Sequence, residues 1–135
     1  MDDVAERKRL EANKELARRF MELAVNPQTA HQARELLTDD YLQHNPNLPD
    51  GPDAILNFAA TEEGRQAKEL MKPAGRAMFF AEGDHVVMMQ PISRPDPVRP
   101  GEDYVLWWFD MWRVENGKLA EHWDADEKHL WSLRK

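Results

Sequence analysis

The chain has 135 residues, a length typical of one domain, and we expect a single domain over residues 1–135. Its net charge of −7 argues against a nucleic-acid or anionic-membrane partner, because both need clustered basic residues, and the absence of cysteine excludes disulfides and thiolate chemistry. The sequence has no run of about 18 apolar residues and no apolar segment after Met1, so we expect no membrane span, no signal peptide and a cytoplasmic location.

The first half of the sequence has the periodicity of helices. Apolar residues recur at three- and four-residue steps over residues 3–25, which predicts a long amphipathic helix. A second helix is expected over residues 28–37, followed by a short helical turn and a loop in residues 38–46. A third helix is expected over residues 53–70, although Gly64 is unfavourable in its middle.

The second half has the pattern of strands. Four strands are expected in two hairpins, residues 76–81 with 85–90 and residues 103–115 with 118–125. Asn116-Gly117 connects the second pair, and both residues tolerate the positive φ of a tight hairpin turn. The prolines of residues 91–101 predict a loop between the hairpins. Helices followed by antiparallel strands predict an α+β domain with helices on one face of a curved sheet.

Strand alternation sorts the polar residues of the last hairpin onto faces. Trp108, Asp110 and Trp112 share one side of the long strand, and His122 and Asp124 share one side of the return strand. A bent sheet covered by helices would enclose this face and form a cavity with tryptophan walls and three ionisable groups. The opposite face of the long strand is also apolar, so alternation alone leaves open which face points inward.

The residue types of this face suit proton transfer. An apolar pocket disfavours the ionised form of a carboxylate and raises its pKa toward neutrality. A neighbouring histidine or second carboxylate then decides which group carries the proton, an arrangement suited to general acid/base work on a carbon acid or a leaving hydroxyl. The sequence contains no glycine-rich phosphate loop, and we expect no cofactor.

Two other interpretations of these residues stay open. His122 and Asp124 can form an ordinary hydrogen-bonded pair on a solvent-facing strand. His122 and Asp124 can also bind a metal, with His44 as a further ligand. The sequence has no His-x-x-x-His helix to support such a site, and we expect no metal.

Three segments resemble the signature segments of SnoaL-like proteins. They are residues 41–46 (Tyr-Leu-Gln-His-Asn-Pro), residues 81–86 (Ala-Glu-Gly-Asp-His-Val) and residues 109–124, which end in Glu-His-Trp-Asp. These proteins belong to the nuclear-transport-factor-2-like superfamily, with polyketide cyclases, ketosteroid isomerases and scytalone dehydratase. The resemblance implies a cone-shaped, curved mixed sheet around a long helix, a deep internal pocket, and homodimers formed through the outer sheet face.

The resemblance also implies roles for residues. Asp124 is similar in position to the acid/base carboxylate of the cyclases, whereas Asp110 stands where they have a histidine. Either two carboxylates then share one proton, or His122 takes the partner role. His44 matches a residue expected at the pocket, and residues 88–90 lack the histidines of many relatives, which makes the pocket more apolar. The expected lining of the substrate pocket is Trp108, Trp112, Tyr41, Phe58 and Met88.

We therefore expect a cofactor-independent acid/base enzyme for a small to medium apolar carbonyl compound. An aldol-type ring closure by a SnoaL-like polyketide cyclase is the first choice. Asp124 would remove a proton next to a carbonyl, His122 and Asp110 would set its protonation, and His44 would hydrogen-bond the oxyanion. The alternatives are a dehydratase, a double-bond isomerase or a non-catalytic small-molecule-binding module.

Overall fold

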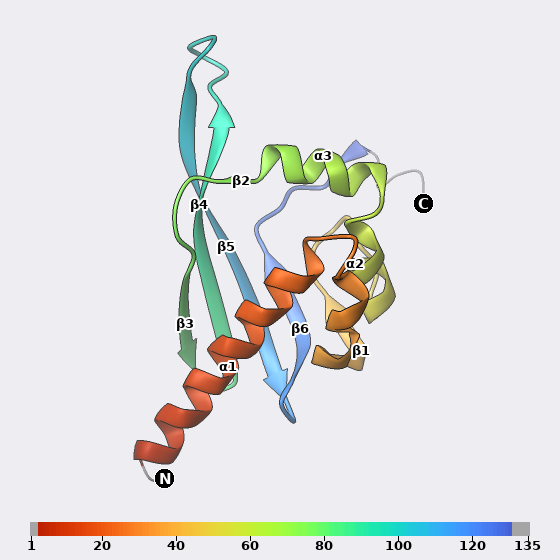
Figure 1. Ribbon diagram of the computed structural model, residues 1–135, viewed down its shortest axis with the longest axis vertical. Helices are drawn as coiled ribbons and strands as arrows, with labels where there is room; N and C mark the ends of the chain where they lie inside the picture. Colours follow the sequence, from red (N-terminus) through yellow and green to blue (C-terminus); the bar gives the residue numbers. More distant parts are fainter. Residues whose placement is uncertain (1–2, 131–135) are drawn as a thin grey trace.

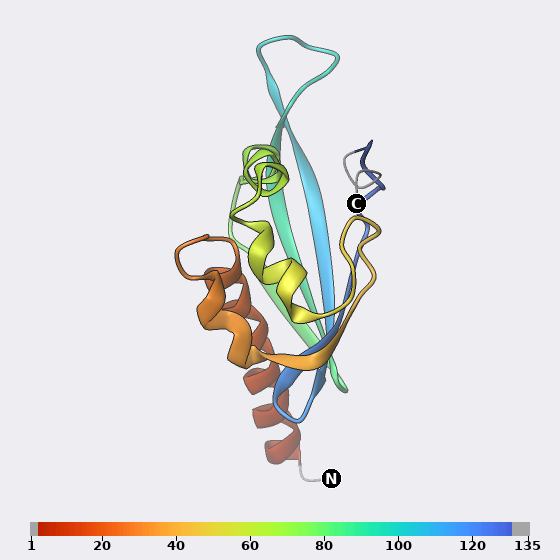
Figure 2. The same ribbon diagram turned by 90° about the vertical axis from the view of Figure 1, so that its right-hand side faces the viewer.

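A long helix lies diagonally across one face of a curved, six-stranded sheet (Figure 1). The computed structural model describes residues 3–130. The first half of the chain forms helix α1 (Asp3–Ala24), the 3-10 helix η1 (Ala30–Leu36), strand β1 (Leu37–Gln43) and helices α2 (Pro52–Phe58) and α3 (Glu62–Leu70). The second half forms strands β2 (Lys72–Pro73), β3 (Met78–Glu82), β4 (His85–Pro95), β5 (Asp103–Glu115) and β6 (Lys118–Asp124). The helices lie on one side of the sheet (Figure 2), which confirms the α+β class.

The sheet is mixed and open. Its strand order is β1-β6-β5-β4-β2, and β3 also pairs with β4. All neighbours are antiparallel except β1, which runs parallel to β6. This parallel pair brings residues near position 43 beside residues near position 122, and it positions the candidate site.

Helix α1 buries one narrow stripe against the sheet. Asn13, Ala17, Phe20 and Ala24 are its buried residues, at steps of three and four, so they share one face of the helix. Phe20 packs edge-on against Trp112 of β5, with ring centroids 6.1 Å apart. The predicted first helix is confirmed, and it covers the face of β5 that carries Asp110 and Trp112.

Residues 44–46 form the expected loop, but the helical turn predicted within residues 38–46 was wrong, because residues 37–43 form strand β1. Its register with β6 shifts between Leu37 and Leu42, so the local pattern is interrupted. Pairing with a strand about 80 positions away favours the extended conformation of residues 37–43. The local sequence does not indicate this pairing. The preceding residues, predicted as an α-helix over 28–37, form the 3-10 helix η1.

The third predicted helix is two helices. Thr61 begins α3, and its hydroxyl oxygen accepts a hydrogen bond from the Gly64 backbone N–H at 3.0 Å. Such a cap satisfies one of the free N–H groups at a helix start. Gly64 is required for packing: a Cβ atom on it would lie 1.9 Å from the Phe58 carbonyl oxygen. The break therefore follows from a capping signal and a close approach of α2 to α3.

The predicted loop over residues 91–101 is shorter, because β4 continues to Pro95. The backbone carbonyl of Pro91 accepts a hydrogen bond from Ala74 N–H at 2.8 Å, in the gap between β2 and β3. In a strand, the N–H and C=O groups of one residue point to the same side. The nitrogen of Pro91, which carries no hydrogen, therefore also faces this gap. The β4–β5 hairpin projects beyond the rest of the molecule as an arm (Figure 1).

The last hairpin has the predicted form. Asn116 and Gly117 have φ values of 51° and 77°, as a two-residue turn requires. Along β5, Asp110, Trp112 and Val114 are buried, whereas Trp107 and Phe109 are exposed. The inner face is thus the one that carries Asp110. Among residues 3–130, no helix is both long and apolar enough to cross a membrane.

Candidate functional site

Strands β5 and β6 bring three ionisable side chains together on the inner face of the sheet. Asp110 and Asp124 are direct partners in the antiparallel ladder. His122 Nε2 lies 2.9 Å from Asp110 Oδ1 and 3.8 Å from Asp124 Oδ2. The side chains of Asp110, His122 and Asp124 are 9%, 8% and 6% exposed. The predicted convergence of these three residues is therefore present, and it is largely shielded from bulk water.

Burial dominates the electrostatics of Asp110. Loss of hydration raises the pKa of the Asp110 carboxyl above its usual value, and the neighbouring Asp124 charge adds to the increase. The hydrogen bond and charge of His122 act in the opposite direction and offset part of it. Asp110 thus has the character of a carboxyl group that holds its proton more tightly than an exposed one, with a histidine nitrogen beside it.

A glutamine on β1 completes the contacts of His122. Gln43 is the ladder partner of His122, and its Oε1 atom lies 2.7 Å from His122 Nδ1. The imidazole therefore has Gln43 on one side and Asp110 on the other. Trp112 packs beside the ring with centroids 5.4 Å apart, so the histidine cannot rotate without displacing core side chains.

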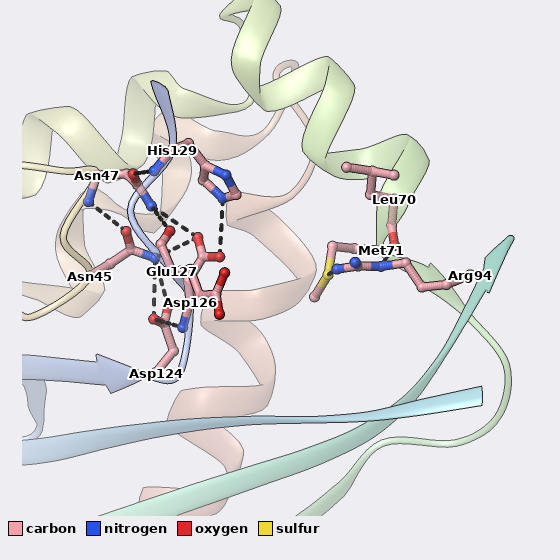
Figure 3. A network of polar contacts seen from close by, with 9 residues as sticks. All are labelled: Asn45, Asn47, Leu70, Met71, Arg94, Asp124, Asp126, Glu127 and His129. Carbon is pink, nitrogen blue, oxygen red and sulfur yellow. Dashed lines mark hydrogen bonds and ion pairs between the residues drawn. The ribbon is translucent and has the colours of Figure 1, made fainter. Parts of the chain in front are cut away.

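The Asp124 carboxylate is held by donors from the loop after β1 and from the segment after β6 (Figure 3). Asn45 Nδ2 lies 3.2 Å from Asp124 Oδ1 and 3.0 Å from Oδ2, and the Asp126 backbone N–H donates to Oδ1 at 3.1 Å. These donors suit an ionised carboxylate, which only accepts. Oδ2 accepts from Asn45 alone among these contacts and keeps acceptor capacity for a proton.

The same loop anchors the segment that follows β6. Asn47 Nδ2 donates to Asp126 Oδ2 at 3.1 Å and to the Glu127 carbonyl at 2.9 Å, and Asn47 Oδ1 accepts from the His129 N–H at 2.7 Å (Figure 3). Residues 124–129 are therefore fixed against residues 45–47. A separate contact in the same view joins Arg94 of β4 to the Leu70 carbonyl at 2.6 Å.

The expected pocket-lining residues occupy different depths. Tyr41, Met88 and Trp112 are in the core, at 0%, 3% and 1% exposure. Burial raises the pKa of the Tyr41 phenol, an effect that the nearby Trp112 partly offsets, so the hydroxyl stays protonated. Trp108 is half-buried on β5 and contacts Asp110, whereas Phe58 is half-buried at the end of α2.

His44 does not join the site, which corrects its expected place at the pocket. Its ring stacks on Trp123 at 5.0 Å between centroids, and its Nε2 atom lies 2.6 Å from Glu121 Oε2. Glu121 and Trp123 alternate with His122 and Asp124 along β6, so they belong to the outer face. The physical reason is that residues 41–43 are a strand, which sends Tyr41 and Gln43 inward and leaves the His44 side chain outside, 46% exposed.

Two functional candidates were missed by sequence reasoning, Gln43 and Asn45. Both flank His44 in the motif of residues 41–46. Interpreting this motif as a strand would have placed Tyr41, Gln43 and Asn45 on one face. The signal was therefore present, but it depended on the correct secondary structure.

Asp110, His122 and Asp124 could also offer ligands to a divalent metal ion. One ligand atom from each lies within 4.8 Å of the others, and a nitrogen with two carboxylates is a plausible donor set. In this structure His122 Nε2 already has a hydrogen-bond partner in Asp110, so an ion would have to displace a proton.

An open groove of about 540 Å³ lies elsewhere, between α1 and β3. It is lined by Val4, Arg7, Lys8, Leu10, Glu11, Lys14 and Ala81. None of the expected site residues borders this groove. The internal pocket beside Asp110 and Asp124 stays a prediction.

Comparisons with known proteins identify the family and the fold of the chain. The family model described as SnoaL-like domain matches residues 17–122, a span that ends at His122. Among curated proteins, no match is found.

Solved structures share the fold at low sequence identity. An NTF2-like protein with a cystatin-like fold from Novosphingobium aromaticivorans is 22% identical, with 92% of this chain and 90% of that chain covered and a TM-score of 0.55. A protein from Xanthomonas campestris pv. campestris, provisionally described as a polyketide cyclase, is 16% identical, with coverages of 83% and 90% and a TM-score of 0.52. An NTF2-like protein from Burkholderia xenovorans is 14% identical, with coverages of 86% and 89% and a TM-score of 0.60.

Proposed function

The chain belongs to the SnoaL-like domain family, and from that premise we propose that it is a cofactor-independent acid/base enzyme for small to medium apolar carbonyl compounds. The observation that carries the proposal is the convergence of Asp110, His122 and Asp124 at 2.9 and 3.8 Å on the buried inner face. Two carboxyl groups and one imidazole can take up a proton at one atom and deliver it from another.

The proposed reaction is an aldol-type ring closure. Asp124 removes a proton from the carbon next to a carbonyl, and the enolate carbon attacks a second carbonyl carbon of the same molecule. A carbon–carbon bond forms while the carbonyl π bond breaks, and the new alkoxide takes a proton from the Asp110–His122 pair. The proton on Asp124 then returns to that pair, so the enzyme ends as it began. His44 has no part in this scheme because its contacts lie on the outer face.

Dehydration and double-bond isomerisation begin with the same step, the removal of a proton next to a carbonyl. The alternative from another class is a non-catalytic binding module. The close approach of two carboxyl groups to one imidazole on the inner face favours an enzyme, and the burial that raises the pKa of Asp110 supports the same choice.

We also propose that the protein forms a homodimer through the outer face of the sheet. Val105, Trp107 and Phe109 of β5 are 51%, 56% and 50% exposed, and Phe80 of β3 is 53% exposed. Phe109 lies in one row with Met89 and Met78 across β5, β4 and β3, so the apolar face is continuous. Continuous exposed apolar faces of this kind are typical of protein interfaces.

The test of the proposed function is exchange of α-protons in D₂O. A panel of apolar ketones and β-dicarbonyl compounds is followed by proton NMR with the wild-type protein. The variant with both Asp110→Asn and Asp124→Asn serves as the blank. We expect faster loss of the α-proton signal with wild type for at least one compound. Equal rates with both proteins, for compounds that raise the unfolding temperature and hence bind, would favour the binding module instead.

A further inference from the structure

We propose that Gln43 is a positioning residue that holds His122 in the tautomer with its proton on Nδ1, so that proton transfer occurs only at Nε2. The argument starts from the backbone. Gln43 and His122 are ladder partners, and the His44 N–H donates to the His122 carbonyl at 2.9 Å. Strands β1 and β6 are thus joined at the point where the two side chains meet.

The orientation of the Gln43 amide follows from a backbone donor. The Asn45 backbone N–H lies 3.1 Å from Gln43 Oε1. A backbone N–H can only donate, so the atom facing it must be the amide oxygen. The flipped amide would set its NH₂ group against this N–H and leave the backbone donor without an acceptor, whereas the observed orientation leaves the buried Nε2 atom of Gln43 without a partner.

The tautomer of His122 follows from the amide orientation. Gln43 Oε1 also lies 2.7 Å from His122 Nδ1, and an amide oxygen only accepts, so Nδ1 must carry a hydrogen. In the neutral ring the lone pair is then on Nε2, which lies 2.9 Å from Asp110 Oδ1. The bond between them needs one proton, which Asp110 donates to a neutral ring or a protonated ring donates to Asp110.

This arrangement restricts the path of the proton. Gln43 Oε1 covers the Nδ1 side of the ring, whereas Asp110 and Asp124 lie on the Nε2 side at 2.9 and 3.8 Å. A histidine with a fixed tautomer presents its basic nitrogen to the acid with no prior rearrangement. Gln43 acts through His122, so its catalytic consequence rests on the proposed function, whereas the tautomer itself does not.

The experiment measures the tautomer directly. Long-range proton–nitrogen correlation spectra of protein labelled with ¹⁵N in histidine distinguish the protonated from the unprotonated ring nitrogen. The His122→Gln variant identifies the His122 signals by their loss. We expect the wild-type neutral ring to have a protonated Nδ1 and an unprotonated Nε2. A neutral ring with its proton on Nε2 would overturn the proposal, and the tautomer is measured on the wild-type protein, with the variant used only for assignment.

Two variants then test whether Gln43 is the cause. Gln43→Leu removes the acceptor, and we expect signals of the Nε2-protonated ring to appear and α-proton exchange to slow by at least about tenfold. Gln43→Glu keeps an acceptor for both donors and should retain the proton on Nδ1. Gln32→Leu, at an exposed glutamine of η1, is the matched control. An unchanged tautomer in Gln43→Leu would contradict the role of Gln43. A changed tautomer with unchanged exchange would confirm that Gln43 sets the tautomer and contradict the part that the proposed function gives to the Asp110–His122 pair.

Discussion

Asp110 and Asp124 lie directly opposite each other on the inner face of the sheet, as cross-strand partners of β5 and β6. Like charges in this position destabilise a sheet. The fold compensates by placing His122 beside Asp110 and by giving Asp124 the donors of Asn45 and Asp126. Residues that weaken a fold and are nevertheless surrounded by specific partners are typical of functional sites.

The first prediction concerns the stability of Asp110→Asn. Burial raises the pKa of Asp110 in the folded protein, so the folded state holds a proton that the unfolded state has lost. Wild-type stability should therefore fall as the pH rises from the unfolded pKa to the folded pKa. Asparagine cannot ionise, so over this pH range the unfolding free energy of the variant should rise relative to that of wild type, on the order of 1 kcal/mol.

Urea unfolding between pH 4 and 8 measures this difference. Asp103→Asn, at an exposed aspartate that begins β5, is the matched control and should show no such trend. A difference between Asp110→Asn and wild type that stays constant with pH would show that Asp110 has no raised pKa in the folded state.

The second prediction separates the roles of His44, which follows β1, and His122 of β6. His44→Ala loses the stacking on Trp123 and the contact with Glu121, which should lower the unfolding free energy by about 0.5–1 kcal/mol. Its rate of α-proton exchange should stay within about twofold of wild type, because the lost contacts lie on the outer face. A loss of exchange as large as that of His122→Gln would return His44 to the site.

The third prediction tests the proposed dimer. Trp107→Glu places a charge at the centre of the exposed apolar face of β5. Truncation of a central aromatic residue often costs 2 kcal/mol or more, so the dimer should dissociate at a concentration higher by roughly 30-fold. Sedimentation equilibrium measures the dissociation constant of the dimer. Val25→Glu, at a half-exposed residue just after α1, is the control, and equal dissociation constants for both variants would argue against this interface.

The fourth prediction concerns the junction of α2 and α3. Gly64→Ala puts a Cβ atom 1.9 Å from the Phe58 carbonyl oxygen, so one helix must shift, at a cost of about 1–3 kcal/mol. Ala67→Gly in the same helix serves as the comparison and should cost about 1 kcal/mol through helix propensity alone. Thermal unfolding of both variants measures how much each one lowers the stability of the protein. A stabilised Gly64→Ala would mean that the two helices are not in close contact.

Elements with a strong local pattern were predictable. The α1 stripe repeats at three- and four-residue steps, and the β5–β6 hairpin alternates around a turn with two positive φ values. From these followed which residues share a face with Asp110 and with His122 and Asp124, whereas alternation left open whether that face points inward. Their convergence needed only one ladder between neighbouring strands, so short-range periodicity was sufficient.

Elements that depend on distant partners were not predictable in the same way. Strand β1 pairs with β6 across most of the chain, and its own residues include two aspartates that are poor strand formers. When a strand is assigned as a helical turn, the predicted direction of each of its side chains is unreliable. The family resemblance placed His44 at the site, and the missed strand concealed that Gln43 and Asn45 point inward instead.

The central claim, that Asp124 is the base, is tested most directly by Asp124→Asn in the α-proton exchange assay. The variant keeps the size of the side chain, and the compound used is the one that wild type exchanges fastest. The account predicts a loss of about 100-fold or more in the exchange rate with a folded protein, because a positioned base contributes that much. Exchange within twofold of wild type would contradict it.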